Sequence, residues 1–247
     1  MAYSRWMQPT QFFSHLTAAE LLGLRLPDGY RAGELHVSST PPERAARSRG
    51  VVGHQASLLD PIAEVHGLRV SGAVDTWLML APTLTVDELI VMGDGLLSRL
   101  RPTSNLDRLG AAAANTSGRR GHNRVRAALR DIRPNTDSAR ETLLRLLVVR
   151  SGFPEPEVNG VILNSFGAAI AHGDLVFRDY RTILEYDGGH HRDDERQFNV
   201  DIDRLDQLME EGWRVIRVNK GLMARRATLV GKVETALEQG GWRRSAQ

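Results

Sequence analysis

Two short segments in the C-terminal half carry carboxylates at spacings that could bind a metal ion. The segment GDLVF contains Asp174, and the segment ILEYDGGHHR contains Glu185 and Asp187. Only a very short loop separates the apolar runs 170–177 and 181–187, a pattern that predicts an antiparallel hairpin. These carboxylates are therefore expected to lie on neighbouring strands.

The hairpin register decides how close the carboxylates come. If residues 178–181 form the loop, Asp174 lies directly opposite Glu185, with Cβ atoms about 4.5–5.5 Å apart. Asp187 projects to the same face as Glu185, because side chains alternate along a strand. Carboxylates placed in this way raise one another's pKa unless a cation lies between them. Oxygen ligands of this type favour Mg²⁺ or Mn²⁺, and the chain has no cysteine for a thiolate zinc site.

A structural alternative is that Asp174 and Glu185 are hairpin surface residues that align by chance, or that each pairs with an arginine such as Arg181 or Arg204. The flanking residues, LVF and TILEY, are apolar, so both faces of the hairpin are expected to be largely buried. Burial favours the metal site. Such an ion would polarise a phosphate oxygen and lower the pKa of a bound water, which is the chemistry of phosphodiester hydrolysis.

The elements that must position these residues follow from apolar patterning. The run DSARETLLRLLVVRSG predicts a helix that begins at Asp137 or Ser138, with Glu141 in its first turn, and stops at Gly152. The order α-β-β-β-α-β-α indicates an α/β fold with a mixed sheet flanked by helices. The later elements are expected at 157–164, 170–177 and 181–187 (strands), 195–211 (helix), 213–219 (strand) and 222–239 (helix).

The N-terminal half predicts a smaller α+β domain. Residues 11–26 are expected to form an amphipathic helix capped by Thr17, followed by short strands and by two helices within 71–100. Its histidines show no metal spacing, and core or surface roles are expected for them: His15, His36, His54 and His66. The predicted organisation is an α+β domain at 1–120, a basic linker at 121–136 and an α/β domain at 137–247.

Positive charge concentrates between the two predicted domains. Nine arginines and two aspartates lie between Arg99 and Arg133. Such a segment could contact the phosphates of a nucleic acid, or it could be a solvated connector. The candidate phosphate contacts are Arg119, Arg120, Arg124 and Arg126.

Length and composition set the remaining bounds. The chain has 247 residues, 41% of them hydrophobic, which is enough for two domains with cores of their own. No apolar run approaches the ~20 residues of a membrane span, and the N-terminus lacks the apolar region of a signal peptide. A cytoplasmic location without a membrane partner is expected, and a homodimer is compatible with the sequence.

Three segments carry a resemblance to a known family: GDLVF, ILEYDGGHHR and QFNVDIDRLDQLMEEGWRVIRVN. Over residues 137–220 the chain resembles the domain of unknown function 559 family, relatives of the very-short-patch-repair endonucleases in the PD-(D/E)XK superfamily. The N-terminal region, roughly residues 10–100, is more weakly similar to AbiEi-type antitoxin proteins, in apolar and turn residues only.

The resemblance implies a restriction-endonuclease-like fold in which Asp174 and Glu185 bind the metal ion. Glu141 would contact a metal-bound water or a second ion. The superfamily lysine is replaced by Asp187, so the residue that activates water stays open. The candidates for it are His190, His191 and Gln197, and Arg204 would orient a carboxylate, grip a phosphate or form a surface ion pair.

The sequence therefore predicts a metal-dependent endonuclease that cleaves DNA, in a defence or repair setting, with RNA as an alternative substrate. The alternative function is a nucleic-acid-binding regulator or antitoxin-like protein that keeps the nuclease fold without catalysis. The two differ in whether the carboxylates bind a catalytic ion.

Overall fold

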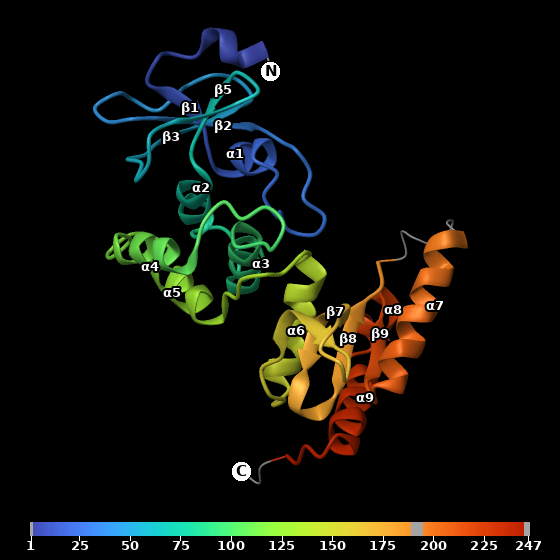
Figure 1. The fold of residues 1–247 in the computed structure, drawn as a ribbon. Coiled ribbons are helices and arrows are strands. Elements are labelled where there is room, and N and C mark those ends of the chain that lie inside the picture. Colours follow the sequence, from blue (N-terminus) through green and yellow to red (C-terminus); the bar gives the residue numbers. More distant parts are fainter. Residues whose placement is uncertain (1, 189–194, 245–247) are drawn as a thin grey trace. The chain divides into compact units, whose positions relative to one another are not determined.

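The computed structural model describes residues 2–188 and 195–244, and the chain divides into two compact units (Figure 1). We call Met1–Pro134 unit 1 and Asn135–Gln247 unit 2. Unit 1 contains a five-stranded sheet and unit 2 a four-stranded sheet, both of mixed strand direction. The fold is α/β, as predicted.

The sheet of unit 1 has the order β3-β2-β1-β5-β4, with the three-residue strand β1 in the middle. Strand β1 pairs antiparallel with β2 and parallel with β5, and its Phe12 and Phe13 are fully buried. Strand β3 pairs parallel with β2. The strands are β1 (Gln11–Phe13), β2 (Leu35–Ser39), β3 (Val51–Gln55), β4 (Ala63–Val65) and β5 (Leu68–Val70).

The first helix of unit 1 is shorter than predicted. Helix α1 covers His15–Leu21, and Ser14 rather than Thr17 is its N-cap residue. Thr17 is buried, and its hydroxyl accepts a hydrogen bond from the His36 amide at 2.9 Å, so it joins α1 to β2 instead of capping the helix. The unit also contains the 3-10 helix η1 (Ala2–Trp6) and the helices α2 (Ala73–Leu80), α3 (Val86–Leu96) and α4 (Leu106–Ala114).

The range 121–136, expected to be a basic linker, consists largely of helix α5 (His122–Asp131). Val125 and Ala128 of α5 are buried, and the helix packs against α3 within unit 1. The reason is that these apolar residues lie three apart on one face of the helix, between exposed arginines. The boundary of unit 1 therefore lies at Pro134.

Unit 2 follows the predicted element order up to its last helix. The single helix expected at 222–239 is two helices that meet at Arg225, which is the C-cap residue of one and the N-cap residue of the next. The elements are α6 (Ala139–Arg150), β6 (Glu157–Leu163), β7 (Ala169–Phe177), the 3-10 helix η2 (Arg178–Tyr180), β8 (Thr182–Tyr186), α7 (Glu195–Glu210), β9 (Arg214–Val218), α8 (Lys220–Ala224) and α9 (Arg226–Gln239).

Alternating side chains divide the core of unit 2 between the two faces of its sheet. Leu175, Leu184 and Val218 pack on one face with residues of α6, α8 and α9. Val176 and Ile183 pack on the other face with Leu208 of α7. Helices therefore cover both faces of the β6-β7-β8-β9 sheet, as Figure 1 shows.

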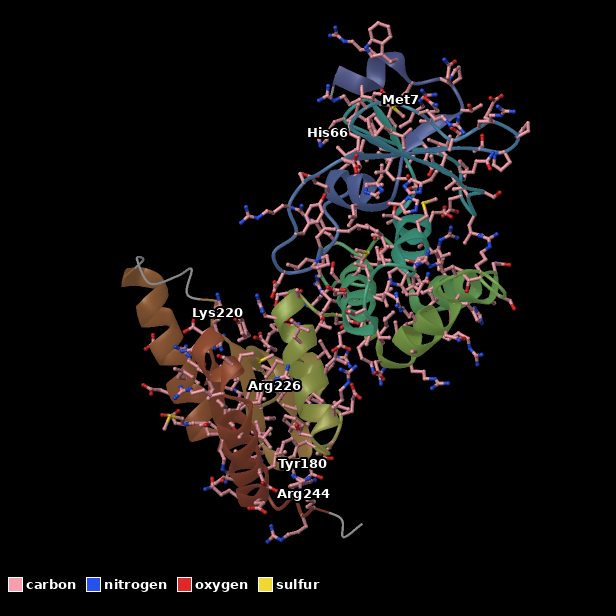
Figure 2. All side chains as sticks on the ribbon, turned by 180° about the vertical axis from the view of Figure 1, so that it is seen from behind. Met7, His66, Tyr180, Lys220, Arg226 and Arg244 are labelled. Carbon is pink, nitrogen blue, oxygen red and sulfur yellow. The ribbon has the colours of Figure 1, made fainter. Side chains whose placement is uncertain are left out.

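The residues that follow α9 lie at the end of unit 2 where the β7–β8 hairpin turns (Figure 2). Tyr180 and Arg244 lie at the same end of the unit in Figure 2, and the Arg244 guanidinium lies 5.4 Å from the ring centroids of both Phe153 and Trp242. This contact combines burial of apolar surface with a cation–π attraction.

Among the described helices, none is both long enough and apolar enough to cross a membrane.

Candidate functional site

The β7–β8 hairpin has the register predicted from the sequence. Leu175 pairs with Leu184 and Phe177 with Thr182, and the same register places Asp174 opposite Glu185. Beyond Leu175 the two strands are joined by a side chain: Oδ2 of Asp174 accepts a hydrogen bond from the backbone N–H of Tyr186 at 2.7 Å. This hydrogen bond fixes the Asp174 carboxylate beside the end of β8.

Glu141 is brought to the same region by the first turn of α6. The Ser138 hydroxyl accepts the Glu141 amide at 3.1 Å and so caps the helix, as the sequence predicts. The Glu141 side chain is only 6% exposed. Its Oε2 accepts hydrogen bonds at 2.8 Å from the Asp137 amide and from Nδ2 of Asn159, a β6 residue. Two donors from two elements therefore hold this carboxylate in one orientation.

Glu141 and Glu185 lie close enough to Asp174 for their charges to change its pKa. The pKa of Asp174 is raised to about 7, chiefly by burial and then by the negative charges of Glu141 and Glu185, whereas the Tyr186 N–H and Arg204 lower it. A carboxyl group with this pKa is divided between its two protonation states at neutral pH. Such a group is a functional-site candidate on physical grounds.

Glu185 forms an ion pair with Arg204 of α7, and the two side chains are 13% and 29% exposed. The pairing with Arg204 that the sequence left as an alternative is thus present. Arg181, the other arginine considered, donates instead to the backbone carbonyl of Glu211. The Arg204 Nε is buried and has no acceptor among the described residues. Arg204 therefore pairs with Glu185 and also lowers the pKa of Asp174.

The remaining predicted catalytic residues are placed less fully. Asp187 directly follows β8, where its amide donates to the Val218 carbonyl at 2.8 Å, and it is not among the charges that shift the pKa of Asp174. His190 and His191 lie outside the described residues. Gln197 belongs to α7, but its side chain lies outside the described part of the chain. The geometry thus unites Glu141, Asp174 and Glu185.

The donor set suits a hard divalent cation. Carboxylate oxygens from α6, β7 and β8 are the ligands that Mg²⁺ and Mn²⁺ prefer. The three carboxylates are not as compact as a preformed three-ligand cage: among the described residues, the group whose ligand atoms all lie within 4.8 Å of one another is His15, His36 and His54. By the resemblance, Asp174 and Glu185 would hold the ion, and Glu141 would contact a metal-bound water or a second ion.

The predicted phosphate contacts in unit 1 separate into two kinds. Arg119, Arg120 and Arg126 are exposed. Arg124 is engaged in the fold, because its Nη1 donates to the Pro82 carbonyl at 2.9 Å and to the Leu84 carbonyl at 3.2 Å. Arg124 therefore joins α5 to the segment that follows α2.

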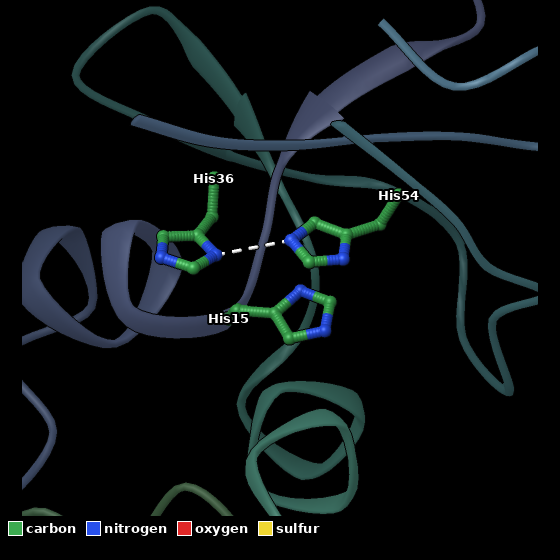
Figure 3. Close-up of side chains that lie close together, drawn as sticks. All are labelled: His15, His36 and His54. Atoms are coloured by element: carbon green, nitrogen blue, oxygen red, sulfur yellow. Dashed lines mark hydrogen bonds between the residues drawn. The ribbon is translucent and has the colours of Figure 1, made fainter. Parts of the chain in front are cut away.

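The histidine cluster in unit 1 was not predicted from the sequence. The three imidazoles of His15, His36 and His54 lie together, as Figure 3 shows. They come from α1, β2 and β3, and their proximity depends on the parallel pairing of β2 with β3. Their spacing along the chain carries no metal signal, since a parallel pairing joins segments that no local pattern links.

Comparisons with known proteins identify no relative of the chain: no family model, curated protein or solved structure matches it. The resemblance to the domain of unknown function 559 family accordingly stays a prediction.

Proposed function

We propose that unit 2 is a metal-dependent nuclease domain that hydrolyses DNA phosphodiester bonds with Mg²⁺ or Mn²⁺. The observation that carries the proposal is the pKa of Asp174, which burial and the nearby Glu141 and Glu185 raise to about 7. A site that destabilises its own negative charge in this way gains most from a divalent cation, because the cation stabilises all three carboxylates together.

The neighbouring groups support a site in which the carboxylates are held ready for an ion. The Tyr186 amide orients Asp174, and the Asn159 side chain orients Glu141. These donors hydrogen-bond to the carboxylates and would not touch the ion itself, and partners of this kind commonly raise metal affinity by 10–100-fold. When bound, the ion supplies a Lewis acid that polarises the phosphate and lowers the pKa of an attacking water.

Arg204 has a suitable place for binding the substrate. Its pairing with Glu185 keeps that carboxylate in position, and its buried Nε has no acceptor among the described residues. A phosphate oxygen would satisfy this donor, and an arginine can bridge a carboxylate and a phosphate through separate N–H groups. We infer that Arg204 orients Glu185 and contacts the scissile phosphate.

The fold of unit 2 supports the restriction-endonuclease-like interpretation. The expected order α-β-β-β-α-β is present up to β9, with two helices in place of the last one, and the acids lie on the β7–β8 hairpin and on the helix before it. Asp187 stands in place of the superfamily lysine, and the candidates for the water-activating residue are His190, His191 and Gln197. DNA is the substrate we favour and RNA the alternative.

The second candidate function is a non-catalytic nucleic-acid-binding regulator. The observation that favours it is the Arg204–Glu185 ion pair, because an arginine bound to a carboxylate can replace a metal ion structurally. In that case Asp174 would be partly protonated at neutral pH and would need no cation.

The test is a cleavage assay on duplex, nicked, mismatched and single-stranded DNA, and on RNA, with Mg²⁺ or Mn²⁺. We expect Asp174→Asn and Glu185→Gln to lower the cleavage rate at least about 100-fold, because each removes a charged ligand. Asp179→Asn is the matched control, since Asp179 is an exposed acid in the same hairpin. Cleavage that is unchanged in both site variants, or absent with every substrate, would support the regulator instead.

A further inference from the structure

The fold of unit 1 brings three histidines to one place from separate elements. In β2, His36 and Ser38 face the same side, and Ser38 aligns with His54 of the parallel strand β3. His54 therefore shares that side with His36. His15 is the first residue of α1, and the preceding Ser14 is tied to β2 because its amide donates to the His36 carbonyl at 3.0 Å.

The ring nitrogens of the cluster converge. The ligand atoms of all three residues lie within 4.8 Å of one another, and Nδ1 of His36 is 3.0 Å from Nε2 of His54 (Figure 3). The His15 ring stacks on the His54 ring, with the centroids 3.8 Å apart. A tetrahedral ion with bonds of about 2.0–2.1 Å needs ligand nitrogens about 3.3 Å apart. A rotation of the His15 ring out of the stack would complete this geometry.

The histidines are in the protonation state that a metal ion requires. Burial, and after it the neighbouring His54 and His36, lower the pKa of His15 to about 3. Burial is also the largest cause of the lowered pKa of His36 and of His54. Neutral imidazole is the form that binds metal ions, so no proton has to be displaced at neutral pH.

The surroundings of His15 are those of an oriented ligand. His15 has φ 50, a left-handed conformation that is uncommon for a residue with a side chain. Its Nδ1 lies 3.0 Å from the Ser14 hydroxyl, which accepts a hydrogen bond from the Ser38 hydroxyl at 2.8 Å. Both serines are fully buried. Three histidines that only filled space would need neither the unusual backbone nor this buried chain of hydroxyl groups.

We propose that His15, His36 and His54 form a site in unit 1 for a divalent transition-metal ion of the Zn²⁺ type. Imidazole ligands suit Zn²⁺, Cu²⁺ and Ni²⁺ rather than Mg²⁺, so this site is chemically distinct from the carboxylates of unit 2. The proposal does not depend on nuclease activity.

The site opens onto a cavity, which gives the ion a free coordination position. His15 and His54 line a cavity of about 440 Å³ whose wall also contains Arg119, Arg120 and His122. A three-histidine site leaves its fourth position to water or to a substrate. Two arginines and one carboxyl group, that of Asp75, stand on the cavity wall, so water or an anionic oxygen ligand held by the arginines is the expected occupant of that position.

The experiment measures Zn²⁺ and Co²⁺ binding to the full chain by titration calorimetry, with any histidine tag removed, and records the visible spectrum with Co²⁺. We expect one ion per chain at the site, a dissociation constant in the micromolar range or below, and the ligand-field bands of a nitrogen-ligated tetrahedral Co²⁺. Millimolar Mg²⁺ should leave this spectrum unchanged, which separates the site from the carboxylates.

Three single variants test the ligands: His36→Gln, His54→Gln and His15→Asn, the last because asparagine tolerates a positive φ. Each should weaken Co²⁺ binding at least about 100-fold, and the ellipticity spectrum should report that each is folded. His172→Gln, at an exposed position of β7, is the control that should bind as the wild type does. Undiminished Co²⁺ binding in all three variants, or no stoichiometric binding by the wild type, would overturn the proposal.

Discussion

Asp174 is balanced between two protonation states because its surroundings oppose one another. Burial and the two neighbouring glutamates favour the neutral acid, whereas the Tyr186 amide and Arg204 favour the carboxylate. A bound divalent cation would shift this balance fully to the carboxylate. The protonation of Asp174 is therefore linked both to the stability of unit 2 and to its affinity for metal ions.

The first prediction concerns the pH dependence of stability without divalent ions. The pKa of Asp174 rises from 3.8 to about 7 on folding, so the folded unit binds this proton more tightly than the unfolded chain does. The resulting stabilisation is fully present below about pH 4 and is lost as the pH rises to about 7. It amounts at most to something on the order of 4 kcal/mol.

The measurement is amide hydrogen exchange in β7 and β8, which reports the opening of unit 2 alone. The stability of the wild type relative to Asp174→Asn should fall between pH 4 and pH 7, and Mg²⁺ or Mn²⁺ should reduce that fall. Asp179→Asn should behave as the wild type. A difference between wild type and Asp174→Asn that does not change with pH would mean that Asp174 keeps an ordinary pKa.

At the scale of single elements, the arginines of helix α5 and of the turn before it differ in their contacts. Arg119, Arg120, Arg124 and Arg126 are all exposed, and Arg124 also donates to backbone carbonyls that follow α2. If this surface binds nucleic acid, we expect Arg119, Arg120 and Arg126 to contact the phosphates. Each phosphate contact adds about 0.9 to the slope of log affinity against log salt concentration for duplex DNA.

The second prediction is that replacing Arg119, Arg120 and Arg126 by glutamine flattens this slope by about 0.9 for each arginine that contacts a phosphate. Affinity should fall similarly for all sequences, since phosphate contacts do not read bases. Arg124→Gln should instead lower the melting temperature of unit 1, because it leaves backbone carbonyls without their donor. Fluorescence anisotropy at several salt concentrations measures the slope, and an unchanged slope in the triple variant would exclude this surface.

Local patterns in the sequence were sufficient to predict the elements of unit 2 up to β9, but not the division of the last helix into α8 and α9. Alternating apolar residues and the short loop predict the β7–β8 register, and Ser138 with Glu141 marks the start of α6. The same reasoning failed at Thr17, which resembles a cap but bonds to the His36 amide of β2. At Thr17 a hydrogen bond to another strand takes the place of the predicted helix cap, and the residues around Thr17 give no sign of such a long-range contact.

The candidate sites show the same limit. Asp174 and Glu185 are neighbours through a hairpin, a local pairing, so their proximity was predictable. The pairing of Glu185 with Arg204 was one of several alternatives, because it depends on how α7 packs on the sheet. His36 and His54 meet through parallel strands, whose pairing requires a long connection and leaves no periodic signal.

At the scale of the whole molecule, the two units carry different ligand chemistries. Unit 1 offers neutral imidazoles, which suit transition-metal ions, and unit 2 offers carboxylates, which suit Mg²⁺ or Mn²⁺. Each unit also has apolar residues packed into clusters of its own. Two compact units with separate cores are expected to fold independently.

The last prediction follows from that separation: the fragments 1–134 and 135–247 should each fold, and each should respond to only one kind of ion. An ion at 100 times its dissociation constant stabilises the folded state by about 2.7 kcal/mol, which thermal unfolding resolves. Zn²⁺ should raise the melting temperature of 1–134 alone, and Mn²⁺ that of 135–247 alone. His54→Gln and Asp174→Asn should abolish the respective shifts. If both ions stabilised the same fragment, the division of metal chemistry between the units would be wrong, because a single site would then account for both responses.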